Sequence, residues 1–175
     1  MSDLEKVKLN GLLLENVENQ TLEICMAAVQ QNWMAMFHVK EPTSEIYMTA
    51  LQQDGMALRY LNNQTSELCM TAVQQNGLAF KYVKPHLMTS IIGLAAVQQN
   101  GLALNHVDYY QTPKICLAAV QQNGEALFYV EVQTPELCMA AVQQNGLALK
   151  YVKKQTHEIC MAAVQQNELA SKYIY

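Results

Sequence analysis

The sequence predicts an all-α protein, a right-handed α-solenoid built from short two-helix repeats. A Val-Gln-Gln-Asn motif recurs along the chain, and successive anchor residues are 22, 22, 24, 23, 22 and 22 positions apart. A fixed period of this size is typical of solenoids, in which each unit packs on its neighbours. The anchors are Val29, Leu51, Val73, Val97, Val120, Val142 and Val164, where Leu51 begins a variant copy, Leu-Gln-Gln-Asp.

Each unit opens with residues that favour the start of a helix. A threonine stands eight residues before every anchor, where its hydroxyl can accept from the free N–H groups of the first turn. Pro113 and Pro135 follow two of these threonines, at the position where a missing N–H costs nothing. We expect an α-helix of about ten residues that ends at Asn-Gly, with the glycine in the left-handed conformation. The threonines are Thr21, Thr43, Thr65, Thr89, Thr112, Thr134 and Thr156.

The segment after Asn-Gly, such as residues 147–152, fits either a second short helix or a strand of a leucine-rich-repeat-like α/β horseshoe. Its second residue is alanine in every unit, and alanine is favoured in helices and depleted in strands. We therefore predict a second helix and keep the horseshoe as the alternative.

Both ends of the chain lack features of the inner units. Glu5 and Lys6 occupy the place of the later alanine pair, Glu168 replaces the glycine, and Ser171 replaces a leucine. We expect a single domain over residues 1–175, with an N-terminal capping unit at 1–20, repeated units at 21–167 and a C-terminal cap at 168–175. Polar caps at both ends predict a monomer rather than an open-ended stack.

The repeat is irregular only in its middle. The linker before Thr89 is two residues longer than its counterparts, and the linker before Thr112 is one residue longer. Insertions in a solenoid emerge as loops on one edge, where they are free to bind partners. These two linkers contribute the candidate partner-binding residues Pro85, His86, Tyr109 and Tyr110.

Two columns of repeated side chains are further candidates. The first glutamine of each pair could form a polar track for an extended ligand, or the pairs could form a ladder that satisfies helix ends and bridges units. Methionine suits a peptide-binding stripe because it is adaptable, and it equally suits filling the core between repeats. The candidates are Gln30, Gln52, Gln74, Gln98, Gln121, Gln143 and Gln165, with Met26, Met48, Met70, Met139 and Met161.

A column of tyrosines near basic residues leaves a choice between packing and stacking on the bases of a single nucleic-acid strand. Such readers combine aromatic rings with a basic groove. The net charge of −4 and the interruption of the basic column at Phe37, Asn105 and Phe128 make nucleic acid the weaker alternative.

Nothing in the sequence indicates catalysis, a cofactor or a metal site. The four histidines and five cysteines follow no metal-ligand spacing, and the glycines are single rather than phosphate-cradling runs. We expect the cysteines to be small buried residues in a reducing compartment. Without an apolar run of spanning length or a secretory leader, we expect a cytoplasmic protein that is not an enzyme and does not enter a membrane.

The unit at residues 134–152 resembles a known repeat family of unknown function. Its opening Thr-Pro-Glu and its closing Asn-Gly-Leu-Ala-Leu-Lys-Tyr-Val carry the resemblance, and the unit at 84–107 departs most from it. Members occur in amoeba-associated bacteria, protists and giant viruses. The resemblance implies a repeat scaffold, working in a host cytosol if an intracellular microbe or a virus delivers it, and it carries over no functional residue.

The sequence therefore predicts a non-catalytic scaffold that binds a protein or peptide along one face. A structural spacer or assembly component is the alternative, and binding of single-stranded nucleic acid is a weaker one.

Overall fold

The computed structural model describes residues 1–175 and contains only helices, turns and loops. Eight α-helices alternate with eight six-residue 3₁₀-helices, and no strand is present. The first α-helix has seven residues, and each of the others has ten. The all-α repeat solenoid is thus confirmed, and the horseshoe alternative is wrong. The α-helices are α1 (Asp3–Leu9), α2 (Leu22–Gln31), α3 (Ser44–Gln53), α4 (Ser66–Gln75), α5 (Ser90–Gln99), α6 (Pro113–Gln122), α7 (Pro135–Gln144) and α8 (His157–Gln166).

The second helix of each unit is a 3₁₀-helix. The Asn or Asp that ends the α-helix also caps this helix, because its side-chain oxygen accepts from the backbone N–H two residues later. Six residues are longer than most 3₁₀-helices, because the hydrogen-bond geometry of this tighter helix is poorer than that of an α-helix. These helices are η1 (Gly11–Asn16), η2 (Trp33–His38), η3 (Gly55–Tyr60), η4 (Gly77–Tyr82), η6 (Gly101–His106), η8 (Gly124–Tyr129), η9 (Gly146–Tyr151) and η10 (Glu168–Tyr173), with the short turns η5 (Pro85–Leu87) and η7 (Asp108–Tyr110).

The predicted α-helix starts are confirmed in all seven repeated units. Each threonine is the N-cap residue, and its hydroxyl accepts from the backbone N–H three residues later. Removing such a cap costs about 1 kcal/mol, so these seven hydroxyls set the boundaries of the units.

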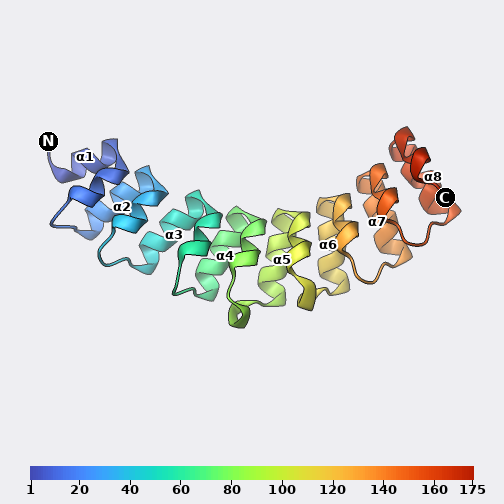
Figure 1. The fold of residues 1–175 in the computed structure, drawn as a ribbon, viewed down its shortest axis with the longest axis horizontal. Helices are drawn as coiled ribbons and strands as arrows, with labels where there is room; N and C mark the ends of the chain where they lie inside the picture. Colours follow the sequence, from blue (N-terminus) through green and yellow to red (C-terminus); the bar gives the residue numbers. More distant parts are fainter.

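The units stand side by side in an arch, with the two termini at opposite ends (Figure 1). The linkers that lead into each α-helix lie along the convex edge, and the turns from α-helix to 3₁₀-helix lie along the concave edge. Consecutive α-helices pack against one another, and so do consecutive 3₁₀-helices. The arch therefore has one lateral face made of α-helices and another made of 3₁₀-helices, which we call the η face.

One hydrophobic cluster of 46 buried residues runs through every unit. From α2 onwards its repeated members are the second alanine of each α-helix and an alanine of each 3₁₀-helix. The anchor valine or leucine of the α-helix and a larger residue of the 3₁₀-helix join them in every unit from α2 to α7. None of the helices is long and apolar enough to cross a membrane.

The predicted left-handed glycine is wrong, because no residue of the chain has a positive φ angle. Glycine is needed instead for close packing between units. A Cβ atom built on Gly55 would lie 2.3 Å from the carbonyl oxygen of Ala72 in the next unit. The same conflict occurs at Gly11, Gly77, Gly101, Gly124 and Gly146.

The polar caps at the two ends stay a prediction, and both ends expose apolar side chains as well. The first unit exposes Leu9 and the last exposes Met161 and Leu169, besides the charged residues that suggested capping. In the inner units the equivalent methionines and Leu94 are partly buried, and Leu117 is exposed.

Candidate functional site

The second glutamine of each pair joins neighbouring units along the concave edge. Its Oε1 accepts from the backbone N–H of the preceding unit's glycine at 2.5–2.7 Å, as in the bond from Gly55 to Gln75. In three of these units its Nε2 also donates to a backbone carbonyl oxygen of the preceding unit, as from Gln75 to Gln53. Gln53 accepts from no glycine and only donates, to the carbonyl oxygen of Val29. We call this set of bonds the concave ladder. The bridging interpretation is therefore correct for the second glutamine.

The first glutamine of each pair takes no part in the ladder. All seven of these side chains are exposed, and no side-chain hydrogen bond to the protein occupies them. A shallow polar groove of about 680 Å³ does run along the concave edge, but it is lined by the second glutamines and by asparagines. The first glutamines remain a prediction as a ligand track.

A second ladder, which sequence analysis missed, runs through the linkers. Gln64 donates from Nε2 to the carbonyl oxygens of Leu58 and Tyr82 and accepts at Oε1 from the backbone N–H of Lys84. The thiol of Cys69 also donates to this Oε1 atom. Equivalent bonds from the linker glutamine to the next 3₁₀-helix occur at Gln20, Gln111, Gln133 and Gln155. We call these bonds the linker ladder.

The signal for the linker ladder was present in the sequence. A glutamine directly before the capping threonine occurs only in units that carry cysteine five residues later. Where Pro42 or Met88 stands instead, the cysteine position holds Tyr47 or Gly93. All five cysteines are buried and unpaired, as predicted, and burial raises the pKa of the Cys69 thiol to about 11.

The methionine column mainly fills space between α-helices. Met26, Met48, Met70 and Met139 are half-buried against the core, and the hydroxyl of Thr71 reaches the sulfur of Met48 across a unit boundary. Met161 is exposed at the end of the array. These side chains leave only part of their surface for a ligand.

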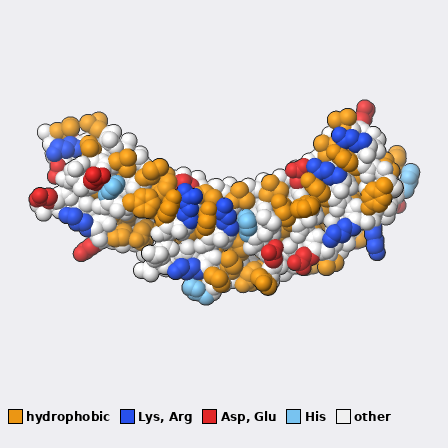
Figure 2. Space-filling view, viewed as in Figure 1, with side chains coloured by type: hydrophobic (Ala, Val, Ile, Leu, Met, Phe, Trp, Pro, Cys, Tyr) orange, Lys and Arg blue, Asp and Glu red, His pale blue; other side chains and the backbone are white.

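The η face carries a row of cations, each placed over the ring of the following tyrosine. Arg59 lies 4.6 Å from the ring centroid of Tyr60, and the other three pairs span 4.6–5.1 Å. Figure 2 shows hydrophobic and basic side chains alternating along this face. We call the row the cation–aromatic stripe, and it consists of Arg59, Tyr60, Lys81, Tyr82, Lys150, Tyr151, Lys172 and Tyr173.

The stripe is continuous from one unit to the next in its N-terminal half. Hydrogen bonds from Lys81 and then from Arg59 lower the pKa of the Tyr82 phenol, although Arg59 belongs to the preceding unit. In the next unit, burial and then the positive charge of Lys81 lower the pKa of His106. The positive charges of η3 and η4 thus act across unit boundaries, and they disfavour a positive charge on His106 of η6.

Exposed aromatic side chains gather at two points of the η face. Phe37, which is 53% exposed, meets Tyr60 edge-on with 5.0 Å between ring centroids, and Trp33 stacks on Tyr60 at 6.3 Å. Phe128, which is 63% exposed, lies 5.3 Å from the ring of Tyr151. Sequence analysis treated Phe37 and Phe128 as interruptions of a basic column, whereas the structure makes them parts of aromatic clusters.

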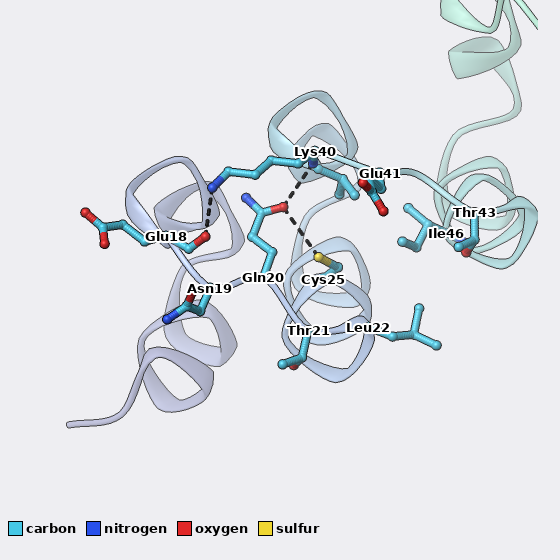
Figure 3. A pocket seen from close by; sticks show the side chains of 11 residues that line it. Glu18, Asn19, Gln20, Thr21, Leu22, Cys25, Lys40, Glu41, Thr43 and Ile46 are labelled. Atoms are coloured by element: carbon cyan, nitrogen blue, oxygen red, sulfur yellow. Dashed lines mark hydrogen bonds between the residues drawn. The ribbon is translucent and has the colours of Figure 1, made fainter.

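Trp33 also marks an unusual interface between α2 and α3. It replaces the glycine, so no bond joins its N–H to Gln53, and Pro42 replaces the linker glutamine. A cavity of about 570 Å³ opens at the convex end of this interface. Figure 3 shows Leu22 of α2 and Ile46 of α3 there, beside the bonds that Gln20 accepts from Lys40 and Cys25.

The irregular linkers emerge on the convex edge on either side of α5 (Figure 1). Pro85 and His86 are exposed in η5, Tyr109 is exposed in η7, and Tyr110 packs partly against the core. Nowhere in the chain do three His, Cys, Asp or Glu side chains come together as metal ligands would.

Comparison with known proteins identifies a family but no characterised relative. The model of a domain of unknown function, DUF4116, matches residues 43–88 and 134–175, which together make up half of the chain. No curated protein and no solved structure matches. The two matched stretches each begin at a capping threonine and include two α-helices with their 3₁₀-helices, so the family model describes a pair of consecutive repeated units. The chain belongs to the family described as a domain of unknown function, DUF4116.

Proposed function

We propose that this chain is a non-catalytic scaffold that binds an acidic segment of another protein along the η face. The observation that carries the proposal is the coincidence of exposed aromatic rings with a row of cations on that face. Trp, Tyr and Arg are the residues that dominate binding energy at protein interfaces.

The aromatic cluster at Trp33, Phe37 and Tyr60 would supply the apolar anchor. Its rings already hold one another through stacked and edge-on contacts, so little side-chain entropy is left to lose on binding. A partner side chain that covers Phe37 would bury a ring that is now half-exposed.

The cations would select the charge of the partner. The three ion pairs of the protein do not include Arg59, Lys81 or Lys172, whereas Lys150 bonds to Glu125 at 3.2 Å. Unpaired cations next to rings favour carboxylates of a partner, and complementary charge raises the rate of association.

The repeated polar side chains are engaged in holding the units together, which supports a scaffold rather than a catalyst. The second glutamines, the linker glutamines and the capping threonines all bond to backbone groups. A spacer role has its own support, because the two ladders and the single core tie most units firmly to their neighbours.

Intrinsic fluorescence provides a direct test, because Trp33 is the only tryptophan. Nine-residue peptides with a central leucine between glutamate pairs, and the same peptides with lysine pairs, would be titrated into the protein. We expect the glutamate peptides to change the fluorescence of Trp33 with an affinity that weakens as salt is added.

Two matched variants distinguish specific binding at the η face from non-specific binding of the peptide. Phe37→Ala with Arg59→Ala should weaken binding at least tenfold, while Gln143→Ala on the concave side should not change it. Equal affinity for both peptide charges would refute the proposal, and tighter binding of an oligothymidine strand would favour the nucleic-acid alternative.

A further inference from the structure

Because all units share one framework, each exposed position can be compared with its counterparts in the same chain. Ile91 is 70% exposed at a helix position where five units carry glutamate and one carries Lys114. Val132 is 76% exposed at a linker position where four other units have polar residues. The corresponding residues are Glu23, Glu45, Glu67, Glu136 and Glu158 for Ile91, and Asn19, Glu41, Asn63 and Lys154 for Val132.

The added residue Tyr109 is 96% exposed in the linker between these two positions. Large apolar side chains at such positions contribute nothing to the packing of the repeat, and contiguous exposed apolar surface marks interaction sites. All three lie in consecutive linkers or helix starts from α5 to α7, along the convex edge (Figure 1). Figure 2 shows hydrophobic side chains gathered on that edge in the middle of the arch, with acidic side chains nearby.

A groove between α6 and α7 lies at one end of this stretch. It has a volume of about 390 Å³, and its apolar walls include Cys116, Leu117, Val132 and Leu137. This volume is in the range of small ligand sites and is enough for one large side chain. The charged residues that line it are Glu131 and Glu136.

Both carboxylates favour a basic ligand. A backbone N–H at the start of α7 and the hydroxyl of Thr134 lower the pKa of Glu136, so it stays ionised at neutral pH. The equivalent groove between α7 and α8 has Lys153 and Lys154 where the α6–α7 groove has Glu131 and Val132. The repeat thus presents the same groove twice in succession with opposite charge.

We propose that the α6–α7 groove and the adjoining Val132 and Tyr109 bind a basic segment of a partner protein, with one large apolar side chain in the groove and lysines or arginines next to Glu131 and Glu136. This site lies on the convex edge, whereas the stripe lies on the η face, and the two select opposite charges. The scaffold would then hold two partners of different chemistry at once.

The repeat itself supplies a variant that is compatible with folding. Glu131→Lys with Val132→Lys gives this linker the sequence of the next one, Lys153-Lys154. Circular dichroism would confirm that the variant folds like the wild type. Affinity would be measured by anisotropy with labelled nine-residue peptides in which a central leucine or alanine lies between lysine pairs or glutamate pairs.

We expect the wild type to prefer the leucine peptide with lysines, and the double variant to bind it at least tenfold more weakly. Binding of the glutamate peptides at the stripe, followed by Trp33 fluorescence, should not weaken in the variant. The proposal is overturned if the wild type does not bind the lysine peptide, if the central leucine gives no advantage over alanine, or if the variant binds equally well. Because the stripe is tested with the opposite charge and its own reporter, failure at one site is distinguishable from failure at the other.

Discussion

The interfaces α7–α8 and α2–α3 have the same architecture but are held together differently. At α7–α8 the N–H of Gly146 donates to Gln166, and Gln155 bonds to the carbonyl oxygens of Leu149 and Tyr173. At α2–α3, Trp33 and Pro42 remove both of these connections. The cavity at the convex end measures about 570 Å³ there and about 290 Å³ at α7–α8.

The difference teaches that the ladders position the units and that aromatic contacts can replace them. Trp33 and Tyr60 stack across the α2–α3 boundary, where the bond from glycine to glutamine is missing. The α2–α3 interface has fewer hydrogen bonds and a larger cavity than α7–α8, and it carries an exposed aromatic cluster on the η face. The proposed binding surface thus lies where the repeat lacks part of its internal bonding.

Adding a methyl group at the regular interface should have the largest effect. A Cβ atom on Gly146 would lie 2.4 Å from the carbonyl oxygen of Ala163, so Gly146→Ala forces α8 away. We expect a loss of about 3 kcal/mol in the free energy of unfolding, typical of overpacking. Glu168→Ala, at the same position in the last unit, is the control and should change it by less than about 0.5 kcal/mol in urea denaturation.

Removing a linker glutamine should have the next largest effect. Gln155→Ala deletes both donated bonds and the one accepted from the N–H of Tyr175. We expect a loss of about 2 kcal/mol, because two part-buried carbonyl groups and one exposed N–H group lose their partner. Gln165→Ala removes an exposed glutamine of the same array, and a similar loss there would contradict the ladder assignment.

Restoring the missing glutamine should make the irregular interface more like the regular one. In Pro42→Gln with Tyr47→Cys, the new amide can reach the carbonyl oxygen of Tyr60 and the N–H of Asn62, by analogy with Gln64. We expect a gain of about 1 kcal/mol in the free energy of unfolding. The peptide affinity of the η face is measured in parallel, and destabilisation by the double change would show that α2–α3 cannot accept the ladder.

The smallest expected effect is a dependence on pH. The pKa of the Cys69 thiol is about 11 in the folded chain and 9.0 ordinarily, so the folded state keeps the proton longer. Its contribution to stability is complete below pH 9 and is lost as the pH rises from 9 towards 11. Between pH 8 and pH 9.5 the wild type should lose up to about 1 kcal/mol more than Cys69→Ala. Parallel pH curves for the two proteins would count against burial as the cause.

The sequence was enough to predict the units, their threonine caps and the ten-residue α-helices, because these depend on local spacing. It did not predict the role of glycine, since the conflict at Gly55 involves a carbonyl oxygen 17 residues away in the chain. The linker ladder was not predicted, because the bonds of Gln64 reach backbone groups of two different 3₁₀-helices, which the sequence does not bring together. The sequence does show that this glutamine occurs together with Cys69 and its counterparts. The sequence showed the stripe only as an interrupted column of basic residues. The contact between Phe37 and Tyr60 crosses a unit boundary, and the sequence alone does not indicate such contacts.

Hydrogen exchange at single backbone amides tests the central claim, that the bond from the first amide of each 3₁₀-helix to a glutamine of the next unit is missing only at α2–α3, where the bond from Gln53 to the carbonyl oxygen of Val29 is all that remains of the concave ladder. The first amide of each 3₁₀-helix donates to a glutamine at Gly11, Gly55, Gly77, Gly101, Gly124 and Gly146, but not at Trp33. We predict that the glycine amides of the inner units Gly55 to Gly124 exchange at least tenfold more slowly than the amide of Trp33. Equal protection of Trp33 and these glycines would contradict the account.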